Sequence, residues 1–100
     1  MQTVNIDMHF QVTGNADLDA LTNQIFEELL RTESSDPAIS NSGMQTELST
    51  GKVWIQVAAE SNDFSGAATT GAETILRAIR SATAEPTAFE LIQQTAEVAA

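Results

Sequence analysis

Strict alternation of apolar and polar residues opens the chain. The apolar residues are Val4, Ile6, Met8, Phe10 and Val12. The residues that separate them, Asn5, Asp7, His9 and Gln11, are all polar. Because successive side chains of a strand point to opposite sides, this period of two predicts a strand with one buried face and one open face. The open face would carry Thr3, Asn5, Asp7, His9, Gln11 and Thr13.

Two later stretches have the period of amphipathic helices. Leu18, Leu21, Ile25 and Leu29 repeat at three- and four-residue spacing, which predicts a helix capped by Asn15 or Asp17 and ending near Arg31–Thr32. Residues 33–37 contain serine, aspartate and proline, and we expect a loop there. A second helix would begin after a cap at Ser61, Asn62 or Asp63. Its inner stripe would be Phe64, Ala68, Ala72, Ile75, Ile79 and Ala82, with Gly66 and Gly71 allowing close approach to a sheet.

Between the predicted helices, the residues around Gly51 read as a β-hairpin. With Thr50 and Gly51 as the centre of a tight turn, the apolar pairs would be Leu48–Val53, Thr46–Ile55 and Met44–Val57. The opposite face would then pair Glu47 with Trp54 and Gln45 with Gln56. Thr-Gly is a less demanding turn than Asn-Gly, so a longer loop is the alternative.

The last segment admits two readings. Phe89 to Ile92 resembles the start of an edge strand, whereas Thr87 and Glu90 match a capping box and residues 93–100 favour a helix. We favour the strand, because a fourth strand would keep the first strand off the edge of the sheet.

The resulting order is strand, helix, strand, strand, helix, strand. With right-handed crossovers this order predicts a ferredoxin-like βαββαβ sandwich, an α+β fold in which two helices cover one face of a four-stranded antiparallel sheet. We expect a single domain over residues 1–100.

Charge and composition narrow the range of partners. Fourteen acidic residues against four basic ones give a formal net charge of −10, which argues against binding a nucleic-acid backbone. Three explanations for the many acidic residues are solubility, adaptation to high salt, and mimicry of the DNA phosphate array. The chain has no cysteine and no apolar run as long as a membrane span, so we expect no membrane association. The expected location is cytoplasmic or intracellular, with a virion as the alternative.

Function must lie on the open face of the predicted sheet, where a tryptophan is the most unusual residue. We take Trp54 as an anchor and surround it with the polar residues expected nearby. Our main interpretation is a non-enzymatic module that binds a partner protein or a second copy of itself as a homo-oligomer, including a subunit of a viral or phage assembly. The predicted binding residues are Trp54, Asn5, Asp7, His9, Gln45, Glu47 and Gln56.

Three other interpretations stay open. Asn5, Trp54 and His9 on an open sheet are similar to the constellation of small monooxygenases and haem-degrading enzymes with this fold. That resemblance implies that Asn5 binds a substrate oxygen, Trp54 walls an apolar pocket, and His9 is a base or a haem ligand. The strand order is also that of ACT-type domains, which would place a small effector near Gly14. An acidic DNA mimic would use Asp17, Asp19, Glu27, Glu28 and Glu33.

The sequence offers no metal or cofactor site. Asp7 and His9 point the same way along one strand and could supply two ligands, but two ligands do not make a metal site. No serine is spaced to pair with the single histidine as a nucleophile. We therefore expect no metal, no cofactor and no catalytic residues under the main interpretation.

Overall fold

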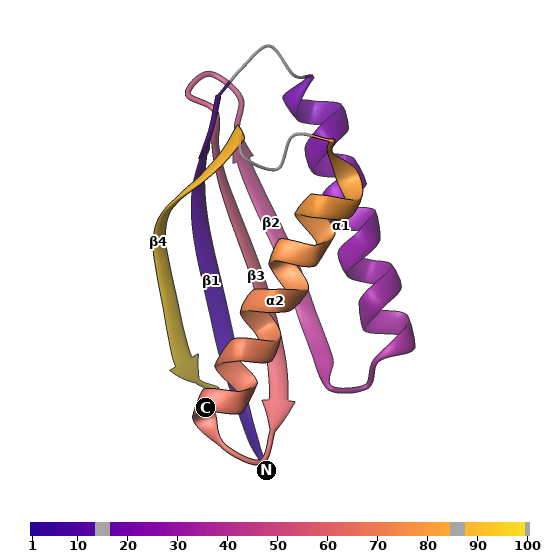
Figure 1. The fold of residues 1–100 in the computed structure, drawn as a ribbon, viewed down its shortest axis with the longest axis vertical. Helices are drawn as coiled ribbons and strands as arrows, with labels where there is room; N and C mark the ends of the chain where they lie inside the picture. Colours follow the sequence, from indigo (N-terminus) through magenta and orange to yellow (C-terminus); the bar gives the residue numbers. More distant parts are fainter. Residues whose placement is uncertain (14–16, 85–87, 100) are drawn as a thin grey trace.

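The computed structural model describes residues 1–13, 17–84 and 88–99 (Figure 1). The predicted turn at Gly14 and Asn15, and Thr87 of the alternative capping box, lie outside these residues. The elements in chain order are β1 (Gln2–Val12), α1 (Leu18–Ser35), β2 (Ile39–Glu47), β3 (Lys52–Ser61), α2 (Phe64–Ala82) and β4 (Phe89–Val98).

The four strands form one antiparallel sheet in the order β2-β3-β1-β4. Both helices lie on the same face of this sheet, over β1, β2 and β3, and β4 lies at the far edge (Figure 1). The prediction of a ferredoxin-like βαββαβ fold is therefore confirmed, and the last segment is a strand rather than a helix. We call the face away from the helices the open face.

The alternation in β1 sorts its side chains between the two faces as expected. Val4, Ile6, Met8 and Phe10 are at most 1% exposed and point at the helices. They pack with Ile25 and Leu29 of α1, with Ile75 and Ile79 of α2, and with the buried residues of β3. Burial of such side chains contributes roughly 1.5–3 kcal/mol each. This single core fixes which face of the sheet remains free.

Both helices begin at aspartate caps among the residues that the sequence indicated. The side chains of Asp17 and Asp63 accept hydrogen bonds from the backbone N–H groups of Ala20 and Gly66, at 3.2 and 2.6 Å. No helix in the described part of the chain has both the length and the apolar character that crossing a membrane requires.

The first helix is longer than predicted. It continues to Ser35 through the stretch that we expected to be a loop. Thr32 and Ser34 donate their hydroxyl hydrogens to the carbonyls of Glu28 and Leu30, so these polar residues are accommodated in the last turns. The helix ends at Ser35, and its C-cap residue Asp36 immediately precedes Pro37.

The predicted register of the β2–β3 hairpin is wrong by two residues. Gln45, not Glu47, lies opposite Trp54, and Glu47 lies opposite Lys52. The turn is a four-residue loop, Leu48 to Gly51, in which Gly51 has a positive φ of 76° and Leu48 is exposed. Because a shift of two residues preserves the alternation, every strand residue keeps its predicted face.

The stripe of α2 that faces the sheet is rotated from the predicted one. Phe64 is exposed, and the buried residues are Ala67, Gly71, Thr74, Ile75, Ala78 and Ile79. Gly71 of the helix lies close against β1, since a Cβ atom there would lie 2.3 Å from Cδ1 of Ile6. The predicted close packing of a glycine-containing helix is thus present at this position.

We expect Gly71→Ala to destabilise the protein by about 1 kcal/mol, although alanine favours a helix over glycine by about the same amount. The added methyl group would overpack the buried Ile6 side chain. Urea denaturation followed by circular dichroism measures the change, with the exposed Thr69→Ala as a control for helix propensity alone. The loss should shrink when Ile6→Val removes Cδ1. A more stable Gly71→Ala protein would show that the helix does not lie this close to the sheet.

Candidate functional site

Pairing of β1 with β3 brings the predicted site residues together on the open face. His9 lies opposite Trp54, Asp7 opposite Gln56, and Asn5 opposite Ala58. Gln45 of β2 lies on the other side of Trp54. These neighbours follow from the antiparallel register, since residues opposite each other in adjacent strands have Cβ atoms about 4.5–5.5 Å apart.

A stacked pair of rings stands at the centre of this face. The centroids of the His9 and Trp54 rings are 4.4 Å apart, and the planes are inclined by 17°. Both residues are half-buried. Nε2 of His9 is buried and has no hydrogen-bond partner among the described residues. The stack is thus well packed but leaves one polar atom unsatisfied.

Among the described residues, Asp7 lines three hollows, and two of them also touch the ring stack. The histidine hollow, about 190 Å³, lies between β1 and β4; the tryptophan hollow, about 200 Å³, lies toward β2. The histidine hollow is lined by Asp7, Met8, His9, Trp54, Gln93 and Thr95. The tryptophan hollow is lined by Asp7, Gly43, Met44, Gln45, Trp54, Ile55 and Gln56.

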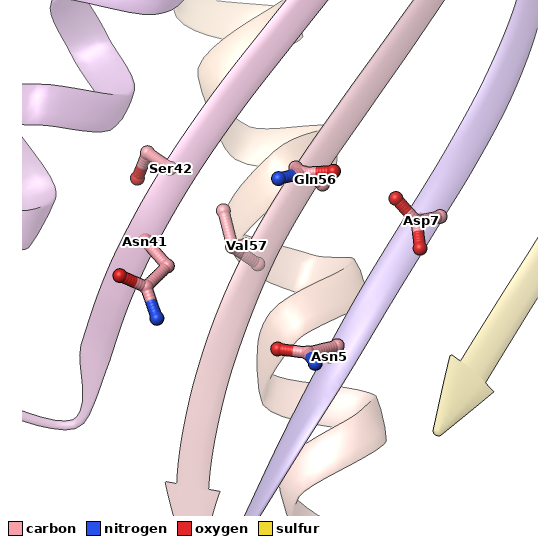
Figure 2. Close-up of a pocket in the computed structure, with 6 residues that line it drawn as sticks. All are labelled: Asn5, Asp7, Asn41, Ser42, Gln56 and Val57. Carbon is pink, nitrogen blue, oxygen red and sulfur yellow. The ribbon is translucent and has the colours of Figure 1, made fainter. Parts of the chain in front are cut away.

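The third and largest, which we call the polar hollow, has a volume of about 520 Å³. Figure 2 shows its lining residues on β1, β2 and β3, with α2 behind the sheet. It is lined by Asn5, Asp7, Asn41, Ser42, Gln56 and Val57. Asn5 is four residues from His9 along β1, a separation of about 13 Å in an extended strand. Asn5 therefore does not meet the ring stack, whereas Asp7 lies between them.

Six of the seven predicted binding residues line these hollows, and Glu47 does not. Its carboxylate accepts a hydrogen bond of 2.7 Å from the hydroxyl of Thr50, beside the hairpin loop. The two-residue register error had placed Glu47 next to Trp54. No group of three or more metal-ligating side chains occurs among the described residues.

The sequence analysis missed Asn41, Ser42 and Gly43. They lie at a β-bulge, where the pairing of β2 with β3 shifts between Ser40 and Gly43. A polar Asn-Ser-Gly run inside a strand is the signal that could have indicated this bulge, because asparagine and glycine adopt the backbone conformations that bulges use. Asn41 has a positive φ of 52°.

A fourth hollow lies on the other side of the sheet, between α1 and β2. It has a volume of about 260 Å³ and an apolar floor made by Phe26, Met44 and Leu48. The remaining lining residues are Asp19, Thr22, Asn23 and Thr46. The only histidine of the chain is not among its lining residues. The open face therefore offers an ionisable imidazole that this hollow does not.

Comparisons with known proteins show a similarity in structure but no match to a family model or a curated protein. The structure is similar to a crystal structure of a candidate antibiotic biosynthesis monooxygenase from Chloroflexus aurantiacus J-10-fl, with a TM-score of 0.57 and 16% sequence identity. The match covers 98% of this chain and 93% of the other. It shows that the two chains share a fold over nearly their whole length.

This comparison corrects our main functional interpretation. We expected a non-enzymatic module, but a solved structure that shares the fold is described as a monooxygenase, so we no longer favour the non-enzymatic module. Pairing of β1 with β3 places two of the three residues of that resemblance, His9 and Trp54, side by side.

We expect Trp54→Ala to leave the fold intact, with a loss of about 1–2 kcal/mol, because stacking of one ring pair contributes roughly 0.5–1.5 kcal/mol beyond its buried area. Ile55→Ala, on the core face of the same strand, should cost about 2–5 kcal/mol. Urea unfolding measured by far-ultraviolet circular dichroism compares the two variants. Equal losses would place the Trp54 ring in the core and end its candidacy as a functional residue.

Proposed function

We propose that this protein is a small oxygenase that oxidises an aromatic substrate with molecular oxygen on the open face of its sheet. The observation that carries the proposal is the His9–Trp54 stack between open hollows, on a fold shared with a candidate monooxygenase. An imidazole beside a flat aromatic ring combines a proton acceptor with a surface for an aromatic substrate.

The base in this reaction would be His9, the only imidazole of the chain. Its Nε2 is buried, whereas Nδ1 is not among the buried unsatisfied atoms, and we assign the proton transfer to Nδ1. Removing a proton from an acidic C–H group next to an aromatic carbonyl leaves an electron-rich anion, which can reduce oxygen. Positioned general bases typically accelerate such a step by about 10²- to 10⁴-fold.

The overall conversion balances without another reductant. A methylene compound and oxygen give a ketone and water, R₂CH₂ + O₂ → R₂C=O + H₂O, with one oxygen atom in the ketone and the other in water. The substrate supplies all four electrons. The protein has to hold the substrate, accept its proton and keep the anion close to oxygen, which are tasks for side chains such as His9 and Trp54.

The remaining open-face residues would orient the substrate. Asp7 and Gln56 line the tryptophan hollow, where they can hydrogen-bond to hydroxyl groups of a substrate whose rings lie against Trp54. The resemblance assigns a substrate oxygen to Asn5, which lines the polar hollow instead. A substrate that reaches both Asn5 and His9 must therefore extend along β1.

Haem ligation by His9 does not fit this arrangement. Nε2 is buried, and Nδ1 lies beside the bond from the ring to Cβ, where a macrocycle is crowded but a small C–H or O–H group is not. We derive no step through haem.

The proposal can be tested with dithranol, a tricyclic phenol with one acidic methylene group. We expect the protein to accelerate oxygen uptake and quinone formation above autoxidation, and His9→Gln to lose most of this acceleration, by about 10²-fold or more. An oxygen electrode and quinone absorbance measure both quantities. Thr3→Ala, on the same strand and face but outside the three hollows, is the matched control.

Trp54→Phe should raise KM more than it lowers kcat, because phenylalanine keeps an aromatic surface while reducing its area. If the wild-type protein and His9→Gln oxidise the probe at the same rate, His9 is not the base and the proposed chemistry is wrong.

A further inference from the structure

The bulge in β2 interrupts the pairing of β2 with β3 beside the polar hollow. Ser40 pairs with Ala58 and Gly43 with Gln56, so Asn41 and Ser42 together lie opposite Val57. This extra residue interrupts the ladder, and Asn41 adopts a positive φ of 52°. The side chains of Asn41 from β2 and Asn5 from β1 both point toward β3 between them (Figure 2). Strained backbone of this kind is often found at functional sites.

The lining of the polar hollow is rich in hydrogen-bonding groups and contains no cation. Three carboxamides, from Asn5, Asn41 and Gln56, accompany the carboxylate of Asp7 and the hydroxyl of Ser42. The carboxamides both donate and accept, and the carboxylate accepts. An anionic ligand would meet Asp7 and a chain of net charge −10 without a compensating lysine or arginine in the lining. Uncharged ligands with many hydroxyl groups match this inventory.

One of these groups lacks a partner within the protein. Oγ of Ser42 is buried and makes no hydrogen bond among the described residues. A buried hydroxyl normally finds a partner, and leaving one unsatisfied is unfavourable by roughly 1–3 kcal/mol. Because this hydroxyl is buried, a ligand in the polar hollow would reach the exposed carboxamides and the Asp7 carboxylate instead.

The polar hollow and the tryptophan hollow adjoin at Asp7 and Gln56. The Gln56 side chain packs closely on Gly43 of β2, since a Cβ atom at Gly43 would lie 2.9 Å from Nε2 of Gln56. Gln56 and Asp7 line both hollows, and Trp54 lines the second. A ring bound across them would therefore meet amide and carboxylate groups at its edge and an aromatic surface at one end.

From these features we infer that the polar hollow is a binding site for an uncharged polyhydroxylated group, such as a sugar ring. Its volume of about 520 Å³ lies in the range of small-molecule sites. Adjacent hydroxyl groups of the ligand would donate to Asp7 and exchange hydrogen bonds with Asn41 and Gln56. The inference goes beyond the proposed function and does not depend on oxygen chemistry. A single molecule could nevertheless occupy the polar hollow and contact Trp54 at the same time.

The test is a titration with p-nitrophenyl β-D-glucopyranoside, which joins a sugar to an aromatic ring, followed by nitrogen-15 chemical shifts and calorimetry. We expect the largest shifts at Asp7, Asn41, Ser42 and Gln56. Asp7→Asn removes the charged acceptor and should weaken binding about tenfold. Asn41→Gly keeps the positive φ but removes the side chain, so it should weaken binding severalfold without changing the bulge.

The controls separate this site from the ring stack. His9→Gln and Thr3→Ala should bind the glucoside as the wild type does. Glucoside binding by a wild-type protein that does not accelerate dithranol oxidation would therefore contradict only the proposed function. 4-Nitroanisole, which lacks the sugar, should be insensitive to Asn41→Gly. Three results would overturn the inference: no binding at 20 mM glucoside, equal binding by Asp7→Asn and Asn41→Gly, or tighter binding of p-nitrophenyl phosphate or benzylamine than of the glucoside.

Discussion

The central strand β1 is the constraint on which the rest of this structure depends. It pairs with β3 on one side and β4 on the other, and its alternate residues form the middle of the core. Where Gly71 of α2 meets Ile6, the helix is held against the sheet with no room for an additional methyl group. This contact fixes which side of β1 is buried in the core. It thereby fixes that Asp7 and His9, one residue on either side of Met8, emerge together on the open face.

Properties that depend on alternation could be predicted from the sequence. The order of elements, the two faces of β1 and the neighbours of Trp54 on β1 all follow from a period of two combined with antiparallel pairing. The absolute register of the hairpin could not be obtained in this way. A slip of two residues keeps each strand residue on its face, so the pattern of Met44, Val53 and Ile55 cannot distinguish the tight turn from the observed loop.

The parts of the site that escaped prediction are those in which local backbone geometry overrides alternation. The bulge at Asn41 and Ser42 adds one residue to β2, and a simple face assignment fails there because the bulge resets the period. The end of α1 was missed for a related reason. Serine and threonine usually favour caps and turns, but Thr32 and Ser34 satisfy their hydroxyl groups on carbonyls of the preceding turn. In both places, hydrogen bonds or torsions specific to the folded chain decide the outcome.

Among the described residues, Nε2 of His9 and Oγ of Ser42 are buried without a hydrogen-bond partner. His9 lines the histidine hollow, Ser42 lines the polar hollow, and Asp7 lines both. Each unsatisfied atom is unfavourable to the free protein by roughly 1–3 kcal/mol, which a sequence under selection for stability alone would remove by substitution. The carboxylate of Asp7 and the three carboxamides of the polar hollow are exposed beside these atoms, where a ligand can reach them. Such a face is less suited to contact with water alone than to binding a polar small molecule.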